Sequence, residues 1–436
     1  MPKLQAQAVN SKMAHQNDIF PNLETGAIRE IRFNSGKLVP IKIKAMKKSF
    51  TALVFITALL LTQAFAQTSG DGTWQVVKTK NKVAARSECS LVAVNGKLYL
   101  IGGDGPAEPV EVYDPKTNEW VKKAVAPVVM HHLQAVALGD KIYVLDAFYD
   151  GGFPNQSPMP NSYYYDTKTD TWTKLAEIPA DRRRAGAGEA VYNGKLYLVC
   201  GITHGHSSGT NAMFDEYDPK TNAWKVLPDA PHIRDHSMAV VVGDKLYAVG
   251  GRNTSFRDPK NVIPFFRMVM LDVDCYDFKT GTWSTLAAKL PMGTGGGTAV
   301  NLNNKIYYIG GERATETTQN HAQKDVYYLD PATDTHWTKT ADLNLARNGV
   351  GGAVLGHKIY IAGGSGGGPG GPPPPNGGGP GMQGPPNGPP PGGGNPPGGT
   401  LPNGPPPNGG AQNGPPPGQR PNGPQGFIDL EVFTSK

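Results

Sequence analysis

Short apolar segments separated by polar turns recur along the chain from about residue 72 onward. In the first unit, the segment 90–94 ("SLVAV") is followed by an Asn-Gly pair at 95–96 and a second segment at 97–103 ("KLYLIGG"). Asn-Gly pairs suit the φ > 0 turns of β-hairpins. A third segment (109–114) ends in Tyr-Asp, and a polar turn leads to a fourth that carries Trp120. The unit therefore predicts four short strands.

This four-strand unit is repeated. The second-strand signature occurs at "GKLYLIGG" (96–103), "DKIYVLDA" (140–147), "GKLYLVCG" (194–201), "DKLYAVGG" (244–251), "NKIYYIGG" (304–311) and "HKIYIAGG" (357–364). The tryptophan of the fourth strand recurs at Trp120, Trp172, Trp224, Trp283 and Trp337. We interpret the repeated Tyr, Asp and Trp as scaffold residues, because each unit needs the same turn and the same packing.

The repeated double glycine, tyrosine and tryptophan resemble the kelch repeat, over about residues 72–364 and 427–434. Departures are Asp146-Ala147 and Cys200-Gly201 in place of Gly-Gly, and Phe433 in place of a tyrosine. The resemblance implies an all-β, six-bladed β-propeller with four antiparallel strands per blade around a central channel. The sixth unit has no fourth strand of its own, so we expect the N-terminal strand that carries Trp74 to complete this last blade and close the ring.

Segments of unusual composition mark the domain boundaries. Residues 46–66 ("MKKSFTALVFITALLLTQAFA") pair two lysines with an apolar run, which is typical of a signal peptide cleaved near Ala66. Residues 1–45 then precede the true start or, if the segment is retained as an anchor, form a cytoplasmic extension. Residues 67–364 are assigned to the propeller, 365–426 to a disordered Pro/Gly-rich insertion and 427–436 to the third strand of the sixth blade. We therefore predict a secreted or periplasmic protein, with a membrane contact only if the signal segment is retained.

The charge balance argues against a nucleic-acid partner. The net charge is +6, but residues 1–66 contain nine basic and three acidic residues, so the rest of the chain is neutral. The three cysteines, Cys89, Cys200 and Cys275, provide no disulfide framework.

Candidate ligand-binding residues come from the position sixteen residues before the first glycine of each pair, or its substitute. Four of the six units have an arginine there: Arg86, Arg184, Arg234 and Arg347. Kelch adaptor proteins place arginines at a similar point to grip acidic peptides, so the resemblance implies a ring of arginines around the mouth for an anion. Glu88, Asp235 and Glu312 are the acids expected nearest to them. The alternative is that each arginine pairs structurally with a carboxylate or carbonyl group.

Other polar residues near these arginines extend the predicted site. The remaining ligand-binding candidates are His131, His132, Asp235, His236, Arg252 and Arg313. The acid–base candidates for catalysis are Glu88, His132, His236 and Glu312. His204 and His206 lie two residues apart, but the sequence indicates no third ligand, so we predict neither a metal nor a cofactor.

Two classes of function fit these residues. The first is an exported recognition module, expected to be a monomer, that binds an anionic glycan or an acidic peptide or protein on the face of its variable loops (104–109, 148–161, 202–213, 252–270, 312–324 and the Pro/Gly-rich insertion). The second is a carbohydrate-active enzyme, because exported bacterial kelch propellers resemble sialic-acid mutarotases or epimerases, which need an arginine and acid–base groups. Galactose-oxidase-like propellers are similar in fold only, since they have seven blades and a copper cofactor.

Overall fold

The computed structural model describes residues 72–258, 263–315, 321–366 and 426–435. The described residues all belong to one compact unit. The predicted signal peptide at 46–66 and most of the insertion at 365–426 lie outside the described residues. Among the described helices, none is long and apolar enough to cross a membrane.

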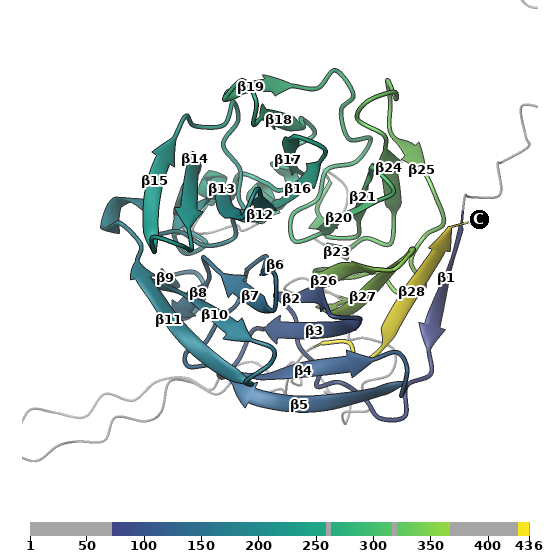
Figure 1. Ribbon diagram of the computed structural model, residues 1–436. Coiled ribbons are helices and arrows are strands. Elements are labelled where there is room, and N and C mark those ends of the chain that lie inside the picture. The colour runs from purple at the N-terminus through teal and green to yellow at the C-terminus, as the bar shows by residue number, and fades with distance from the viewer. Residues whose placement is uncertain (1–71, 259–262, 316–320, 367–425, 436) are drawn as a thin grey trace, which may run out of the picture. The chain divides into compact units, whose positions relative to one another are not determined.

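Six four-stranded antiparallel sheets, the blades, follow one another around a ring (Figure 1). Blade 1 contains β2 (Cys89–Val94), β3 (Lys97–Gly102), β4 (Pro109–Asp114) and β5 (Glu119–Val125). Blade 2 contains β6 (Val136–Leu138), β7 (Lys141–Val144), β10 (Asn161–Asp166) and β11 (Thr171–Glu177). Blade 3 contains β12 (Gly188–Tyr192), β13 (Lys195–His204), β14 (Ser208–Asp218) and β15 (Ala223–Leu227).

The second half of the ring has the same design. Blade 4 contains β16 (Met238–Val242), β17 (Lys245–Val249), β18 (Asp274–Asp277) and β19 (Thr282–Thr285). Blade 5 contains β20 (Thr298–Leu302), β21 (Lys305–Ile309), β24 (Val326–Leu329) and β25 (Thr338–Lys339). Blade 6 contains β26 (Asn348–Leu355), β27 (Lys358–Ser365), β28 (Leu430–Ser435) and β1 (Gly72–Val77). The first strands of neighbouring blades contact one another, so they lie innermost, around the channel.

The N-terminal strand closes the ring as predicted. β1 pairs antiparallel with β28, and Trp74 lies opposite Phe433 in this pair. Figure 1 shows the purple β1 beside the yellow β28. Within the same blade, β28 begins at Leu430 rather than at the expected residue 427.

In blades 1–4 the repeated tyrosine of the third strand and the tryptophan of the fourth strand are cross-strand partners. Tyr113 lies opposite Trp120 in the β4–β5 pair, with ring centroids 5.3 Å apart. Tyr217 and Trp224 repeat this contact at 5.1 Å in blade 3. Such aromatic pairs contribute about 0.5–1.5 kcal/mol beyond the area they bury. The interpretation of these residues as scaffold is confirmed.

The loops between the second and third strands are the variable part of the structure. They contain the short pair β8 (Phe148–Asp150) and β9 (Ser157–Pro158), the 3₁₀ helix η2 (Thr254–Phe256), the helix α2 (Ile263–Arg267), and the short pair β22 (Glu312–Arg313) and β23 (His321–Ala322). A further 3₁₀ helix, η1 (Ala180–Arg182), joins blades 2 and 3. The expected loop at 202–213 is instead largely strand, because β13 and β14 continue as a hairpin whose turn holds His206.

Candidate functional site

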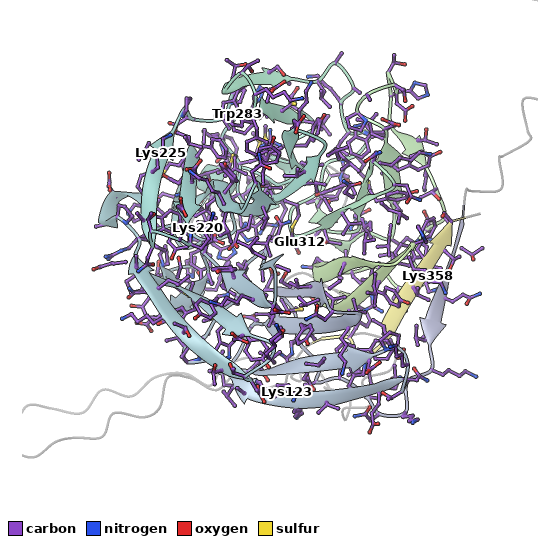
Figure 2. The ribbon with its side chains drawn as sticks, in the orientation of Figure 1. Lys123, Lys220, Lys225, Trp283, Glu312 and Lys358 are labelled. Carbon is purple, nitrogen blue, oxygen red and sulfur yellow. The ribbon has the colours of Figure 1, made fainter. Side chains whose placement is uncertain are left out.

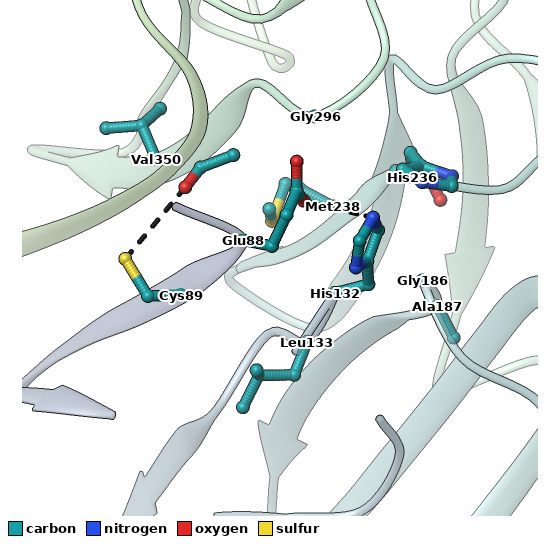
Figure 3. Close-up of a pocket in the computed structure, with 12 residues that line it drawn as sticks. Glu88, Cys89, His132, Leu133, Gly186, Ala187, His236, Met238, Gly296 and Val350 are labelled. Carbon is teal, nitrogen blue, oxygen red and sulfur yellow. Dashed lines mark hydrogen bonds and ion pairs between the residues drawn. The ribbon is translucent and has the colours of Figure 1, made fainter. Parts of the chain in front are cut away.

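Six residues at equivalent positions of the six blades form a ring at one end of the channel. Each lies at or just before the start of the first strand of its blade and has a positive φ between 52° and 64°: Glu88, His132, Gly186, His236, Gly296 and Gly349. Backbone hydrogen bonds connect them around the channel, for example from His132 N to Glu88 O at 3.0 Å and from Gly186 N to His132 O at 2.9 Å. We call these six residues the channel ring; they line the cavity drawn in Figure 3.

Only three members of the channel ring have a side chain. Glycine adopts a positive φ freely, whereas Glu88, His132 and His236 pay a strain on the order of 1–3 kcal/mol each for the same backbone. At Gly349 an added β-carbon would lie 2.6 Å from Glu88 N, so glycine is required there. Strain that persists at three equivalent positions suggests that these side chains serve the site rather than the fold.

A second layer of polar residues surrounds the channel ring. Asp235 forms an isolated β-bridge with Arg252, and Gly295 forms one with Glu312. Arg252 Nη1 donates to Glu312 Oε1 at 2.6 Å, and its guanidinium lies 5.0 Å from the ring centroid of Phe265. Figure 2 shows Glu312 near the centre of the propeller, while Lys225 lies on an outer strand. Arg313 follows Glu312 on β22 and is half-buried.

Three histidines from different blades meet at this site. His206, in the turn between β13 and β14, places its Nε2 3.1 Å from His236 Nε2. The His132 ring centroid lies 4.9 Å from each of the other two rings. His131 contacts His132, with their Nδ1 atoms 2.6 Å apart. His204 is exposed and bonds to Thr203 instead, so of the predicted histidine pair only His206 belongs to this group.

Burial sets the charge state of the site. It lowers the pKa of His132 and of His206 well below the ordinary value, and neighbouring histidines add to the effect. The pKa of His236 is also lowered by burial and by Arg252. Burial raises the pKa of Glu88 to about 8, with help from Glu312 and Asp104. Near neutral pH the three imidazoles are therefore uncharged and the Glu88 carboxyl is largely protonated.

The four arginines singled out by their spacing lie inside the blades. Each has at most 1% of its surface exposed. Each pairs with a carboxylate on the third strand of its own blade: Arg86 with Glu111 at 2.5 Å, Arg184 with Asp215 at 2.8 Å, Arg234 with Asp274 at 2.5 Å, and Arg347 with Glu431 at 2.8 Å. Their partners are thus not Glu88, Asp235 or Glu312, the acids expected from the alignment. Burial and pairing favour a structural role for these arginines over the ligand-binding role.

The sixteen-residue spacing has a direct structural cause. Each arginine donates to the carbonyl oxygen of the residue sixteen positions later, in or directly after the second strand of its blade: Gly102, Cys200, Gly250 and Gly363. The side chain thereby joins the entry of the first strand to the second and third strands. The arginine at this position therefore holds the strands of one blade together. The carbonyl and carboxylate groups of these strands supply the acceptors that a buried guanidinium needs.

Comparison with known proteins agrees with this architecture. Residues 61–289 match the family described as Attractin/LZTR1 beta-propeller, and residues 216–364 match the KLHDC2/KLHL20/DRC7 Kelch-repeats domain. The chain belongs to the kelch β-propeller family.

Relatives of this kelch propeller are distant in sequence. It is 28% identical over 313 residues to Kelch-like protein terF of Aspergillus terreus, covering 68% of this chain and 66% of that protein. It is 26% identical over 298 residues to Kelch-like protein 36 of Rattus norvegicus, covering 66% and 44%. The chain thus spans less than two thirds of the length of these relatives. The solved structure of YjhT aligns with a TM-score of 0.56 at 18% identity, covering 66% of this chain and 93% of that one, a likeness of fold.

Two hollows on the kelch propeller differ in size. The space enclosed by the channel ring is about 20 Å³, roughly the volume that one water needs. A hollow of about 550 Å³ lies among the loops of blades 2 and 3 and is lined by residues that include Tyr149, Pro158, Arg183, His204 and Met213. The larger hollow has a volume typical of ligand pockets.

Sequence reasoning found part of the site. His131, His132, Asp235, His236, Arg252 and Glu312 were predicted there and do come together around the channel. It missed His206 as a partner of His132 and His236, because His206 lies in a turn outside the repeated pattern. The available signal was that His132 and His236 occupy the same position of the repeat, where three blades have glycine.

Proposed function

We propose that this kelch propeller is an exported, non-catalytic recognition module that binds a protein partner on its variable-loop face. The observation that carries the proposal is the exposure of large apolar side chains on the loops of that face. Phe153 is 44% exposed and Phe256 is 56% exposed. Exposed aromatic side chains of this kind are typical anchors of protein interfaces.

These two aromatic residues have a cation beside them. The Arg257 guanidinium lies 5.5 Å from the Phe153 ring centroid, and Phe256 is its neighbour in the chain. Phe153 also packs against His206, at 5.2 Å between ring centroids, so the apolar surface adjoins the channel ring. Aromatic residues and arginine are the side chains most enriched at the energetic centres of interfaces.

An acidic partner fits the half-exposed cations of this face. The Arg183 side chain is 29% exposed, lines the larger hollow and pairs with the exposed Glu177, so a ligand carboxylate would compete with Glu177 for it. Arg183 and Arg257 are thus placed to meet carboxylates of a peptide or glycan, a role for which the four buried arginines are poorly placed.

A binding assay with matched variants tests this proposal. Peptides selected from a displayed library against the purified protein would be titrated into the double variant Phe153→Ala/Phe256→Ala. We expect at least about a 30-fold loss of affinity, as for two hot-spot residues. The control is Val121→Ala/Val226→Ala, which truncates side chains that are 50% and 60% exposed on outer strands. Equal affinity in both double variants would refute the proposed face.

Export is part of the same proposal and rests on residues 46–66. Mass spectrometry of the protein recovered outside the cytoplasm should show a chain that begins at Gln67. A chain that retains residues 46–66 would favour the membrane anchor instead.

A sugar-active enzyme such as a sialic-acid-type mutarotase or epimerase is the second candidate. Glu88 Oε2 lies 3.6 Å from His132 Nε2, which gives the channel mouth an acid–base pair. The space between the channel-ring residues is too small for a sugar, so the sugar would have to bind above the channel ring. NMR exchange spectroscopy would show faster interconversion of sialic acid anomers with the protein than with Glu88→Gln. No acceleration by the unaltered protein would exclude this candidate.

A further inference from the structure

We propose that His132, His206 and His236 form a binding site for a divalent transition-metal ion such as Zn²⁺ at the mouth of the central channel. One ring nitrogen from each of the three histidines lies within 4.8 Å of the others. The site adjoins the proposed partner-binding face at the Phe153–His206 contact, but its three histidines are themselves at least 91% buried and are separate from the exposed side chains of that face.

The distances suit tetrahedral coordination. Zn–N bonds of 2.0–2.1 Å at tetrahedral angles separate two ligand nitrogens by about 3.3 Å. The Nε2 atoms of His206 and His236 are 3.1 Å apart, close to this value. A ring nitrogen of His132 lies within 4.8 Å of a nitrogen of each of the other two, so His132 must move closer to them to complete a three-histidine site.

The outer hydrogen bonds direct the lone pairs of two histidines toward each other. His236 Nδ1 donates to Asp235 Oδ1 at 2.6 Å, and His206 Nδ1 donates to Gln156 Oε1 at 3.1 Å. Both Nε2 atoms are then acceptors, and two acceptors at 3.1 Å repel each other. A cation between them removes this repulsion. A carboxylate or amide oxygen behind each metal-binding histidine is the usual outer partner in metal sites.

The surrounding charges favour a cation. The carboxylates of Asp104, Asp235 and Glu312 outnumber the guanidinium groups of Arg252 and Arg257 around the histidines, while the Glu88 carboxyl adds little charge near neutral pH. Arg252 is already paired with Glu312. The Glu88 carboxyl lies 3.6 Å from His132 Nε2 and could be the fourth ligand after it releases its proton on metal binding. The alternative fourth ligand is a water, for which the enclosed 20 Å³ leaves room.

The blades explain how such a site is built. His132 and His236 are on the channel ring, where each holds a positive φ that glycine adopts more easily. His206 reaches them because the β13–β14 hairpin extends beyond the blade. Metal binding would offset the backbone strain at the two channel-ring positions, because the free energy of metal binding adds to the stability of the folded state.

The test is calorimetric titration of the chelator-treated full chain with Zn²⁺, supported by the visible absorption of Co²⁺. We expect one tight Zn²⁺ per chain and a rise in melting temperature that EDTA reverses. His206→Ala should weaken binding by more than about 100-fold, and Asp235→Asn by about 10–100-fold as for other outer partners. The matched control is His204→Ala, which removes an exposed histidine of the same hairpin.

Each result decides for or against the site. Zn²⁺ affinity that is unchanged in His206→Ala, or lost equally in His204→Ala, would mean that surface histidines bind the ion. The absence of stoichiometric binding to the unaltered protein would overturn the proposal outright. His206→Gln serves as a second variant if the alanine variant unfolds in the metal-free state.

Discussion

Asp146 and Glu189 form a buried carboxyl pair between blades 2 and 3, and both are fully buried. Asp146 stands where most blades have the first glycine of the pair. Its Oδ2 accepts from Ala187 N at 3.0 Å, and Glu189 Oε1 accepts from Leu145 N at 2.8 Å. Burial raises the pKa of Asp146 to about 7 and that of Glu189 well above its ordinary value, while Arg184 acts in the opposite direction on Asp146.

This pair makes stability depend on pH. Between about pH 4 and pH 7 the folded protein holds more protons on Asp146 than the unfolded chain does, so the free energy of unfolding falls as the pH rises through this range. Asp146→Asn removes one titrating group and should flatten this dependence, measured by urea denaturation at pH 5 and pH 7.5. The exposed Glu119→Gln is the control. An equally steep dependence in Asp146→Asn would contradict the assignment.

The four buried arginines that pair with third-strand carboxylates allow a second test at a single residue. Arg234→Ala leaves Asp274 buried and without its guanidinium, which costs about 3–5 kcal/mol of stability. Arg234→Lys should restore little, because an ammonium group cannot reproduce the bonds to Asp274 and to the Ala248, Gly250 and Asp272 carbonyls. Urea denaturation against Lys225→Ala, on the exposed side of β15, gives the comparison. Unchanged stability of Arg234→Ala would return the arginine to the ligand-binding candidates.

Among the strands, β1 has the largest consequence for the fold, because it joins the two ends of the propeller. It pairs with β28 along its whole length, from Gly72 opposite Ser435 to Val77 opposite Leu430. Trp74 is buried, its ring lies 5.2 Å from the Phe433 ring at an interplanar angle of 43°, and its Nε1 donates to Ala341 O at 3.0 Å. β1 is therefore held in two ways. Its backbone pairs with the third strand of blade 6, and the Trp74 side chain binds the segment that links blade 5 to blade 6.

Removing β1 should prevent ring closure. A chain that begins at Ala84 exposes the edge of β28, so we expect aggregation or failure to fold, seen by size-exclusion chromatography. Trp74→Ala should cost about 3–5 kcal/mol, whereas Val76→Ala, on the exposed side of the same strand, should cost little. A monomeric protein beginning at Ala84 with an unchanged melting temperature would contradict closure by β1.

At the scale of the whole propeller, the segment between Gly364 and Phe427 is where we expect the chain length to be changeable. The chain leaves blade 6 and re-enters it there at adjacent points. Phe427 N donates to Gly364 O at 2.8 Å, and the Arg347 guanidinium lies 4.6 Å from the Phe427 ring. The two ends of the segment between them are thus adjacent in blade 6. The length of a connection with adjacent ends changes its closure entropy only slowly.

Replacing residues 367–424, which lie outside the described residues, with a short Gly/Ser linker should therefore preserve the propeller. We expect a melting temperature within a few degrees of that of the full chain and an unchanged circular dichroism spectrum. Loss of soluble protein would show that this segment contributes to folding. Repeating the zinc titration on this variant should give the same stoichiometry, because no histidine of the proposed site lies in the segment.

The repeat alone was enough to predict six blades, their strand order and the closing strand with Trp74, because each of these features depends on residues close together in one unit or on a count of units. It also located His132 and His236 correctly at one position of the repeat. The partners of the arginines and the approach of His206 to His236 depended on the tertiary structure. Carboxylates of the third strand reach the arginines only through the twist and pairing of a folded blade, and His206 joins two channel-ring histidines only because three blades converge on one axis. Side-chain direction and the distance between blades decide such contacts, and neither is encoded in the spacing of residues along the chain.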